Sequence, residues 1–368
     1  MKCLAFDLGK VIFDFDYDIG LDKIKDKLGV SQDRVIHTLF YEDFTLDFER
    51  GLVSCQDFYK EFVKKFKANL GYEEFIDIWC NIFSPKLEMV DLVRRARLIY
   101  PTYLISNINK VHFEHLKNSF GEIFSFFDDL ILSFEVKAVK PQREIYEVLR
   151  KKAQTTFDSI VYIDDREELI NEAKKLGLRC IKFISLPQLV GEMEFYNVFI
   201  PSGEESITLE RLKEKIDSNQ NNFILVGIGN VIREDDSVGS LIMSSLKEKV
   251  SFKVYDAGNS LENHLDKLAH QNNRLIVFVD CAYYDDDSRF KLFSPQMSYD
   301  LNLYFTHNSS LKLAIQYLQE YNRIDILILG IRGNRFGIGE ALSRDVYIVK
   351  EILESFFLRH YSKGGKFK

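Results

Sequence analysis

Short apolar runs alternate along the chain with longer stretches of mixed apolar and charged residues. In the first half these runs are CLAFDLG, PTYLISN, DSIVYIDD and RCIKFI, and in the second half they are NFILVGIG, FKVYDAG, RLIVFVD, LNLYFTH and DILILGI. Runs of this length predict buried strands, and the spacing or charge of the stretches between them predicts helices. Strands that alternate with helices favour a parallel sheet covered on both faces, so the pattern predicts an α/β fold class.

Length and two breaks in this alternation predict two domains. The 368 residues exceed the roughly 100 to 200 residues of an average domain. A Phe-rich helical insertion over about 18–88 interrupts the first alternation, and we expect it to cap the end of the sheet. We expect a first domain over 1–190, a linker over 191–220, a second domain over 221–360 and a basic tail over 361–368. No sequence repeat relates the halves, which indicates two different doubly wound α/β domains.

Composition and charge narrow the classes of partner. Hydrophobic residues make up 46% of the chain and charged residues 29%, which is typical of a globular protein and disfavours long disorder. The net charge of -7 argues against nucleic acid and acidic membrane surfaces as partners. No window approaches the roughly 18 apolar residues that span a bilayer. Five cysteines without a CxxC pair favour free thiols in a reducing, cytoplasmic location.

Polar residues at strand ends are the first candidates for a site in the first domain. Ligands of an open parallel sheet bind beyond the carboxyl ends of its strands. Asp7 ends CLAF, Ser106 and Asn107 end PTYLI, and Asp164 and Asp165 end SIVYI. Lys140 follows EVKAV and precedes Pro141. A carboxylate nucleophile, a hydroxyl, a cation and an acidic pair are the groups that phosphoryl transfer needs if Mg²⁺ bridges the acids. Taken alone, a lysine before a proline is more often a solvated surface residue.

Over about residues 1–190 the sequence resembles the haloacid dehalogenase-like hydrolases. The resemblance is carried by FDLGKVIFD, LISNIN, VKPQREIYEVL and YIDDREELINEAKKLG, and FERGLVSCQDF resembles the helical cap of that family. It implies a Rossmann-like fold in which Asp7 is the nucleophile. It further implies that Ser106 hydrogen-bonds the phosphoryl group and that Lys140 balances its charge.

The same resemblance implies a magnesium site with one departure from the family pattern. Mg²⁺ would be held by Asp7, by the backbone carbonyl of Gly9, and by Asp165 with Asp164. Typical phosphatases of the family carry a general acid/base Asp where this chain has Gly9. A glycine still offers its carbonyl to a metal, but it has no side chain to protonate a leaving group. The sequence therefore leaves open an active phosphatase for a small phosphorylated metabolite and a domain that only binds phosphate or is a structural remnant.

In the second domain, the stretch GIGNVIREDDSVG places Glu234, Asp235 and Asp236 just after a strand. A glycine-rich turn weakly suggests a dinucleotide loop, but GxGxxG is absent and the acids disfavour a phosphate ligand. Two further strand ends supply Asp280 and His307. Two carboxylates and an imidazole suit a divalent metal such as Zn²⁺ or Ni²⁺ with open positions. Individually, such an Asp often caps a helix, and a lone His is more often structural.

Over about residues 222–358 the sequence resembles the hydrogenase maturation proteases. These endopeptidases remove a C-terminal extension from the large subunit of [NiFe] hydrogenases once nickel is in place. The resemblance rests on ILVGIGNVIREDDSVG, VYDAGNS, LIVFVDCA, FTHNSSL and ILGIRGNRFGIGEALSRDV. It implies a three-layer α/β/α fold, a hydrogenase large-subunit precursor as partner, and Asp236, Asp280 and His307 facing the nickel that this substrate carries. The other two acids of the EDD run are expected to face solvent or to cap the next helix.

Three interpretations of the whole protein follow. The leading one is a hydrolase in which a maturation endopeptidase is fused to a phosphohydrolase domain. The second is a Mg²⁺-dependent phosphatase of a small phosphorylated metabolite with a regulatory protease-like domain. The third is a maturation scaffold that keeps both pockets for binding but has no catalytic activity. No GxSxG, HExxH or Cys/His nucleophile pattern offers a competing protease chemistry.

Overall fold

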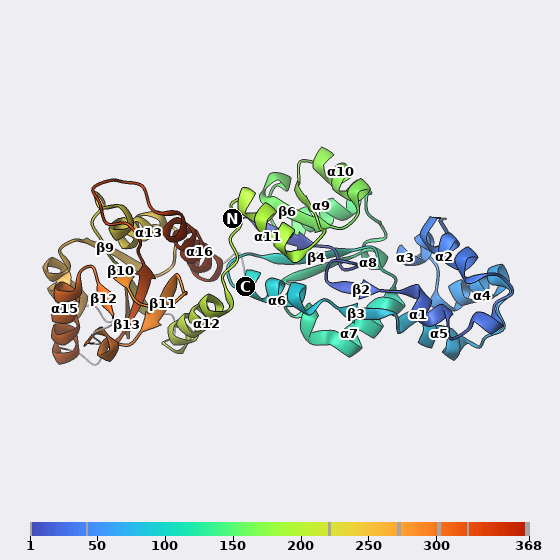
Figure 1. Ribbon diagram of the computed structural model, residues 1–368, viewed down its shortest axis with the longest axis horizontal. Coiled ribbons are helices and arrows are strands. Elements are labelled where there is room, and N and C mark those ends of the chain that lie inside the picture. The colour runs from blue at the N-terminus through green and yellow to red at the C-terminus, as the bar shows by residue number, and fades with distance from the viewer. Residues whose placement is uncertain are drawn as a thin grey trace. The chain divides into compact units, whose positions relative to one another are not determined.

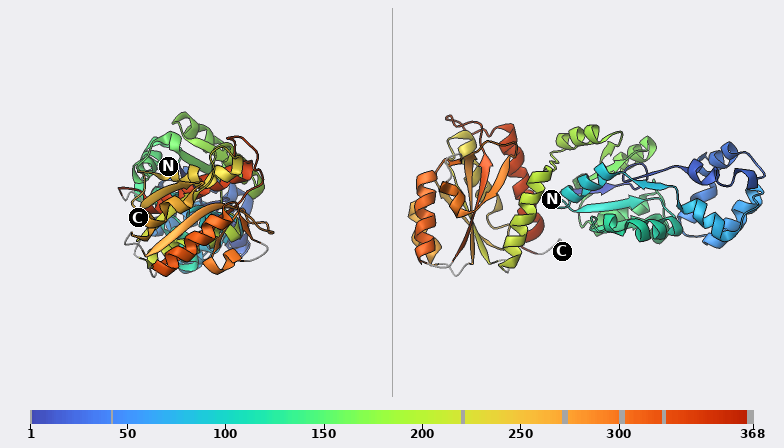
Figure 2. Two further views of the ribbon diagram at one scale, coloured as in Figure 1. Left: turned by 90° about the vertical axis from the view of Figure 1, so that its left-hand side faces the viewer. Right: turned by 60° about the horizontal axis from the view of Figure 1, so that its bottom comes forward.

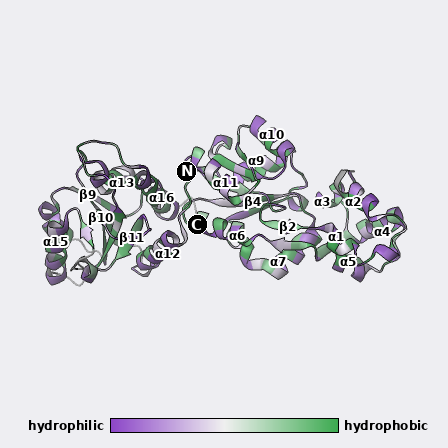
Figure 3. Ribbon diagram, in the orientation of Figure 1, coloured by the Kyte–Doolittle hydropathy of each residue, from purple (hydrophilic) through white to green (hydrophobic). Residues whose placement is uncertain are grey.

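The protein folds into two compact units, which span Met1–Val198 and Phe199–Lys368. The computed structural model describes residues 2–41, 43–219, 222–270, 274–299, 303–321 and 324–364. Each unit has its own sheet and its own hydrophobic core. In both units the outer helices carry most of the hydrophilic residues, whereas the strands are largely hydrophobic (Figure 3).

The first unit is built on a parallel five-stranded sheet with the order β5-β4-β1-β6-β7. Its strands are β1 (Cys3–Phe6), β4 (Thr102–Ser106), β5 (Asp129–Leu132), β6 (Ile160–Asp164) and β7 (Arg179–Lys182). In the centre of the sheet, Phe6 of β1 pairs with Leu104 of β4 and with Ile163 of β6. This register brings the carboxyl ends of the three central strands to one edge, where the residues that follow them meet.

Helices cover both faces of this sheet (Figure 1). They are α6 (Leu87–Ala96), α7 (Lys110–Phe124), α8 (Ser133–Val136), α9 (Arg143–Lys152), α10 (Glu167–Lys175) and α11 (Leu186–Phe195), with the 3-10 helix η3 (Phe157–Ser159) before β6. In α9 the spacing of Ile145, Tyr146 and Leu149 puts all three on one buried stripe. Side chains of α9 and α10 pack together in the core on one face of the sheet.

The insertion between β1 and α6 forms a helical cap with an aromatic core. An antiparallel pair, β2 (Phe13–Phe15) and β3 (Phe83–Pro85), leads into and out of it. Its helices are α1 (Tyr17–Leu21), η1 (Lys25–Lys27), α2 (Gln32–Tyr41), η2 (Asp43–Thr45), α3 (Leu46–Glu49), α4 (Cys55–Phe66) and α5 (Tyr72–Cys80). Phe58 stacks on Phe48 at 4.2 Å and lies 5.2 Å from Trp79 between ring centroids. Many of the Phe residues of the insertion therefore serve as cap core.

The second unit contains a mixed six-stranded sheet with the order β11-β13-β10-β8-β9, and β12 pairs with β10. Its strands are β8 (Phe223–Ile228), β9 (Lys253–Gly258), β10 (Leu275–Tyr283), β11 (Phe290–Phe293), β12 (Tyr304–Phe305) and β13 (Asp325–Arg332). Four strands are parallel, whereas β11 and β12 run antiparallel to their neighbours. The strand predicted over 301–307 corresponds to β12, which spans only Tyr304–Phe305 among the described residues and pairs with the end of β10.

Helices on both faces make this unit a three-layer α/β/α structure, which confirms the predicted fold class. They are α12 (Gly203–Ser218), η4 (Glu234–Ser237), α13 (Val238–Leu246), η5 (Leu261–His264), α14 (Leu265–Ala269), η6 (Pro295–Tyr299), α15 (Asn308–Tyr321) and α16 (Arg344–Tyr361). Figure 2 shows α15 on one side of the sheet and α16 on the other. Residue 361, the first of the expected basic tail, ends α16, and residues 365–368 lie outside the described residues.

The range 191–220, expected as a linker, is mostly helical. It contains the end of α11 and all of α12. Within α12, Glu205 is buried and accepts two hydrogen bonds of 2.7 Å from the Arg289 guanidinium. Its carboxylate also accepts the Ser202 N–H in a capping box. Because Arg289 immediately precedes β11, α12 is part of the second unit and does not act as a free connector.

Two general expectations can be compared with this fold. Among the described residues, no helix combines the length and apolar character needed to cross a membrane. The five cysteines are unpaired; Cys55 is partly exposed and the other four are buried. Burial raises the pKa of the Cys3 thiol to about 12, as expected for a small apolar core residue and not for a reactive thiol.

Candidate active sites

Asp7, Lys140 and Asp164 form a buried ionic cluster at the carboxyl edge of the first sheet. The Lys140 ammonium donates hydrogen bonds of 2.7 Å to Asp7 Oδ1 and to Asp164 Oδ2. Asp7 follows β1, Asp164 ends β6, and Lys140 lies in the loop between α8 and α9. Asp7 is 8% exposed, Asp164 is 0% exposed and Lys140 is 4% exposed. Such burial of charges is stable only when each charge is paired.

Neighbouring groups hold this cluster in place. The side chain of Asn107 brackets the backbone of Lys140: its Oδ1 accepts the Lys140 N–H at 2.7 Å, and its Nδ2 donates to the Lys140 carbonyl at 3.1 Å. Asp164 accepts hydrogen bonds from the Tyr162 hydroxyl and, at 2.9 Å, from the Arg166 N–H. The amide that follows Ser106 in the sequence thus positions the lysine, a role that the sequence did not reveal.

The acids of this site fit a magnesium ion. One carboxylate oxygen each from Asp7, Asp164 and Asp165 lies within 4.8 Å of the others, and oxygen ligands of this kind suit Mg²⁺. Burial raises the pKa of Asp7 to about 7; Lys140 opposes this rise, and Asp164 and Asp165 add to it. The pKa of Asp165 is also raised, by burial first and then by Asp164. Because three carboxylates face one lysine, a divalent cation would compensate the remaining charge.

Ser106 and Gly9 complete the set that the sequence named. Ser106 is buried at the end of β4, the strand next to β1, so it reaches the same sheet edge as Asp7. A Cβ atom added at Gly9 would lie 3.0 Å from Cε1 of Phe15 and 3.9 Å from Oδ2 of Asp7. The ring of Phe15 therefore occupies the space beside Gly9, and the local structure is built around a glycine there.

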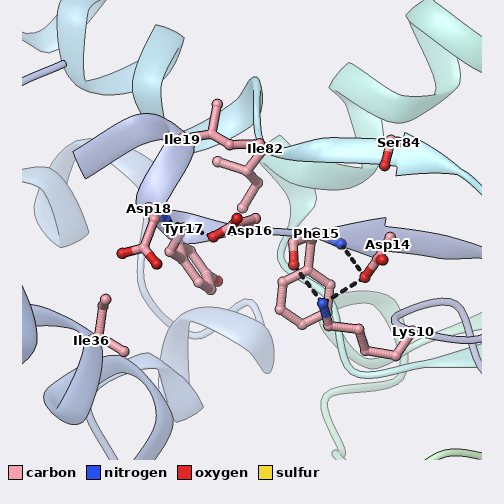
Figure 4. A pocket seen from close by; sticks show the side chains of 10 residues that line it. All are labelled: Lys10, Asp14, Phe15, Asp16, Tyr17, Asp18, Ile19, Ile36, Ile82 and Ser84. Atoms are coloured by element: carbon pink, nitrogen blue, oxygen red, sulfur yellow. Dashed lines mark hydrogen bonds and ion pairs between the residues drawn. The ribbon is translucent and has the colours of Figure 1, made fainter. Parts of the chain in front are cut away.

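A cavity of about 470 Å³ lies between the β2–β3 pair and the cap (Figure 4). Its wall includes Lys10, whose ammonium donates to Asp14 Oδ1 at 2.5 Å and to the Phe15 carbonyl at 2.7 Å. Lys10 also lies 4.6 Å from the centroid of the Phe15 ring. These contacts fix the ring that fills the space beside Gly9. The acids of the ionic cluster do not line this cavity among the described residues.

In the second unit, Asp236, Asp280 and His307 come together. His307 Nδ1 lies 3.1 Å from Asp280 Oδ1 and 3.9 Å from Asp236 Oδ1. Asp236 belongs to η4 after β8, Asp280 lies inside β10, and His307 follows β12. The Cys281 N–H and the Thr306 hydroxyl donate to Asp280 Oδ1 at 2.9 and 3.1 Å. Asp280 is thus held firmly, while its position inside the strand differs from the strand end that the sequence predicted.

The chemistry of this second cluster suits a divalent cation. One ligand atom of each residue lies within 4.8 Å of the others. Asp236 Oδ1 is buried and accepts no hydrogen bond from the described part of the chain. Burial raises the pKa of Asp280, although hydrogen bonding to His307 opposes the rise. Asp236 and His307 also line a cavity of about 440 Å³, so a metal carried by a bound molecule would have access to them.

Asp235 has a different role from the one expected. We expected it to face solvent or to cap the next helix, but it is fully buried. It accepts three backbone N–H groups, those of Asn334, Arg335 and Ser343 at 2.8, 2.9 and 2.7 Å. Glu234 likewise accepts the Gly337 N–H at 2.8 Å. The expectation was wrong because both acids anchor the loop after β13, and only Asp236 of the three is left for the metal cluster.

Exposed apolar side chains lie in this anchored loop and in the segment before η4 that is hydrogen-bonded to it, and the sequence analysis did not single them out. The Gly339 N–H donates to the Ile232 carbonyl at 3.0 Å, and Gly339 accepts the Glu234 N–H at 2.8 Å. Ile232 is 57% exposed and Ile338 is 93% exposed, and Phe336 lines the cavity itself. Large apolar residues inside a glycine-rich, charged stretch were the signal available in the sequence. We call Ile232, Phe336 and Ile338 the apolar rim.

Comparison with known proteins assigns the first unit. Residues 1–177 match the family model described as haloacid dehalogenase-like hydrolase. They form a haloacid dehalogenase-like hydrolase domain. D-ribitol-5-phosphate phosphatase of Bacteroides thetaiotaomicron is 26% identical over 184 residues, which are 48% of this chain and 89% of that protein. A haloacid dehalogenase family enzyme of the same species, solved with magnesium and inorganic phosphate, is 22% identical over 51% of this chain and 98% of its own, with a TM-score of 0.45.

The C-terminal part is similar to hydrogenase maturation proteases. A Methanocaldococcus jannaschii protein, whose name places it provisionally in that family, is 28% identical over 134 residues, which are 33% of this chain and 78% of that protein. Both family resemblances in the sequence are thereby confirmed. The protein is a hydrolase that joins a haloacid dehalogenase-like domain to a domain similar to hydrogenase maturation proteases.

Proposed function

We propose that the second unit is a maturation endopeptidase that recognises nickel carried by a [NiFe] hydrogenase large-subunit precursor and removes its C-terminal extension. The observation that supports this most is the convergence of Asp236, Asp280 and His307 beside a cavity, with a buried Asp236 oxygen that accepts no hydrogen bond from the described residues. The similarity to a maturation protease points the same way.

The proposed recognition makes the enzyme a checkpoint for nickel insertion. A precursor that carries nickel supplies a divalent cation to Asp236, Asp280 and His307, whereas with a nickel-free precursor the two buried carboxylates share only the imidazole of His307. The bound nickel also fixes the scissile peptide in the cavity, and it polarises either the peptide carbonyl or an adjacent water. The apolar rim offers contacts to the precursor segment beside the metal.

The test is trimming of purified precursor, loaded or not loaded with nickel, by variants of the full chain. Asp236→Asn and His307→Gln should abolish trimming of loaded precursor, and wild-type protein should leave nickel-free precursor uncut. His270→Gln is a matched control, because His270 is exposed at the C-cap of α14 and lies outside the cavity that Asp236 and His307 line. Trimming by His307→Gln at the wild-type rate would exclude the proposal.

For the first unit we propose a Mg²⁺-dependent phosphatase that acts on a small phosphorylated metabolite. Asp7 attacks the phosphorus atom, Lys140 balances phosphoryl charge, and Ser106 hydrogen-bonds the transferred group. Asp7, the Gly9 carbonyl, Asp164 and Asp165 would hold Mg²⁺, which when bound neutralises charge on the phosphoryl oxygens. The buried Asp7–Lys140–Asp164 cluster, with Asp165 as a third acidic residue, supports this, and a similar protein is named as a sugar-alcohol phosphate phosphatase.

Release of inorganic phosphate from a panel of phosphomonoesters tests this second activity. Asp7→Asn should abolish release, and Asp129→Asn, which alters a surface pair with Lys152, should not. The two alternative interpretations are distinguished by the pair of assays. Phosphatase activity without trimming indicates a regulatory protease-like domain, and failure of both activities indicates a non-catalytic scaffold.

A further inference from the structure

Tyr162 is a buried tyrosine in the strand that carries Asp164 of the first site. This strand, β6, lies between β1 and β7, and all five of its residues are buried. Side chains two positions apart on a strand point to the same face of the sheet, so Tyr162 and Asp164 share one face of β6. Tyr162 belongs to the same core cluster as Ile145 and Tyr146 of α9. The strand therefore places a phenol ring, otherwise an ordinary core residue, beside an acid of the site.

The ring of Tyr162 is fixed by two neighbours. The ring of Tyr146 meets it edge-on, with 5.7 Å between the centroids and 81° between the planes, which is a favourable arrangement of two aromatic rings. The Lys140 ammonium lies 5.7 Å from the Tyr162 centroid, within the range of a cation–π contact. Because Tyr162 is also 0% exposed, its ring has little freedom to move, and its hydroxyl has a defined position.

The hydroxyl of Tyr162 takes part in the hydrogen bonding of the Asp164 carboxylate. It donates to Oδ2, the oxygen that also accepts the Lys140 ammonium at 2.7 Å. Oδ1 accepts the Arg166 N–H at 2.9 Å. An ionised carboxylate has about four acceptor positions, two on each oxygen. In the described part of the chain, Oδ2 thus accepts two donors and Oδ1 accepts one, which leaves an acceptor position on Oδ1.

We propose that Tyr162 is a positioning residue of the phosphatase: its hydroxyl holds Asp164 in the orientation that leaves Oδ1 open to Mg²⁺. This inference rests on the proposed phosphatase function and its magnesium site. Lys140 alone does not fix the orientation, because an ammonium on a flexible stem can bond to either oxygen of a carboxylate. The packed ring of Tyr162, by contrast, presents its hydroxyl to one oxygen only.

The variant Tyr162→Phe separates this role from a purely electrostatic one, because it keeps the ring and removes only the hydroxyl. If the hydroxyl orients Asp164, its loss lets the carboxylate turn and Mg²⁺ binding weakens; loss of such an outer contact to a metal ligand costs about 10- to 100-fold in affinity. If the hydroxyl only disperses charge on Oδ2, its loss leaves a more strongly charged oxygen, and Mg²⁺ binds more tightly. The two roles therefore predict changes of opposite sign.

The experiment is titration of Mg²⁺ into metal-free, full-length protein, measured by calorimetry. Tyr162→Phe should raise the Kd for Mg²⁺ by about tenfold or more. The Mg²⁺ concentration that gives half the maximal phosphatase rate should rise by a similar factor, whereas the rate at saturating Mg²⁺ should fall less, because excess metal compensates for weaker binding.

Tyr59→Phe is the matched control. The Tyr59 hydroxyl donates to the Leu70 carbonyl at 2.9 Å inside the cap, so this variant also loses one hydrogen bond of a tyrosine in the first unit. Both variants should unfold at a somewhat lower urea concentration than wild type, but Tyr59→Phe should keep the wild-type Kd for Mg²⁺. The cooperative urea transition of Tyr162→Phe also verifies that the variant is folded before its Kd is compared.

An unchanged or lower Kd in Tyr162→Phe would overturn the role of Tyr162, whatever the loss of stability. Failure of the proposed function has a different signature. If wild-type protein binds no Mg²⁺, the magnesium site fails and the role of Tyr162 fails with it. If wild-type protein binds Mg²⁺ but releases phosphate from no phosphomonoester tested, the phosphatase function fails, and the Kd of Tyr162→Phe still decides whether the tyrosine orients Asp164.

Discussion

Replacement of Lys140 by methionine should destabilise the first unit by about 4 kcal/mol at pH 7 in metal-free buffer. The Lys140 side chain is 2% exposed and lies between two carboxylates at 2.7 Å each, so Lys140→Met leaves two buried acids without their cation. Breaking a buried ion pair costs about 3–5 kcal/mol. The loss has a ceiling, because one acid can take up a proton instead. For a carboxyl with an ordinary pKa of 3.8, this costs about 1.4 kcal/mol per pH unit, or about 4 kcal/mol at pH 7.

The pH dependence of this loss follows from the same reasoning. Without Lys140 the folded-state pKa of the acids rises further above the unfolded value, so the stability they contribute is present at low pH and is lost as pH rises. At pH 5 neutralisation costs about 2 kcal/mol, and the difference between wild type and Lys140→Met should shrink to that size. The prediction thus concerns both the magnitude of the loss and its direction with pH.

Urea denaturation followed by tryptophan fluorescence measures this difference. Trp79 is the one tryptophan of the chain, and its carbonyl accepts a hydrogen bond of 2.7 Å from the buried His112 Nε2 of α7, so its emission reports the cap and the core of the first unit. Lys152→Met is the control: Lys152 pairs with Asp129 at 2.7 Å with half-exposed side chains, and its loss should cost about 1 kcal/mol or less. A Lys140→Met loss no larger than that control, or one that grows as pH falls, would refute the reasoning.

Three further predictions concern metal binding and the anchored loop. Mg²⁺ should raise the urea midpoint of the Trp79 transition in wild type but not in Asp164→Asn, because only an intact acidic site gains stability from the ion. Ni²⁺ binding to the full chain, measured by calorimetry, should weaken as pH falls through the pKa of His307, because the proton competes with the metal for the imidazole. Burial lowers the pKa of His307, but the hydrogen bond and charge of Asp280 raise it above the ordinary value of 6.5. Asp235→Asn should speed hydrogen exchange across residues 333–343, since loss of the acceptor for the buried Ser343 N–H costs about 1–3 kcal/mol.

Much of the fold could be predicted because its signals are local. The apolar runs at β1, β4, β6 and β8 consist of consecutive buried residues, and helices such as α9 repeat their apolar positions at helical spacing. Elements with weaker local patterns were missed. β5 has two partly exposed residues among four, and β11 follows a run of acids, so neither shows a continuous apolar stretch. Their strand conformation depends on the neighbours β4 and β13 that pair with them.

In the candidate sites, too, residues with a local sequence signal could be predicted, whereas roles that depend on distant contacts could not. Motifs around Asp7 and Lys140 predicted phosphoryl transfer, and those around Asp236 and His307 predicted a divalent-metal site. The type and order of polar residues after buried strands limit what an open sheet edge can bind. The role of Asp235 could not be predicted in this way. Three consecutive acids look alike in a sequence, and what separates Asp235 from Asp236 is the set of N–H groups that the chain brings back from about a hundred residues away.

The sequence by itself therefore determined the alternation of strands and helices, the two families and the residue types available for catalysis. Only the tertiary structure decided which acids are buried, which are already satisfied by hydrogen bonds, and that the ring of Phe15 lies beside Gly9. The physical reason is the range of the interactions. Backbone conformation and hydrophobic periodicity depend on residues a few positions apart, whereas the desolvation and pairing of a carboxyl depend on groups that folding alone brings into contact.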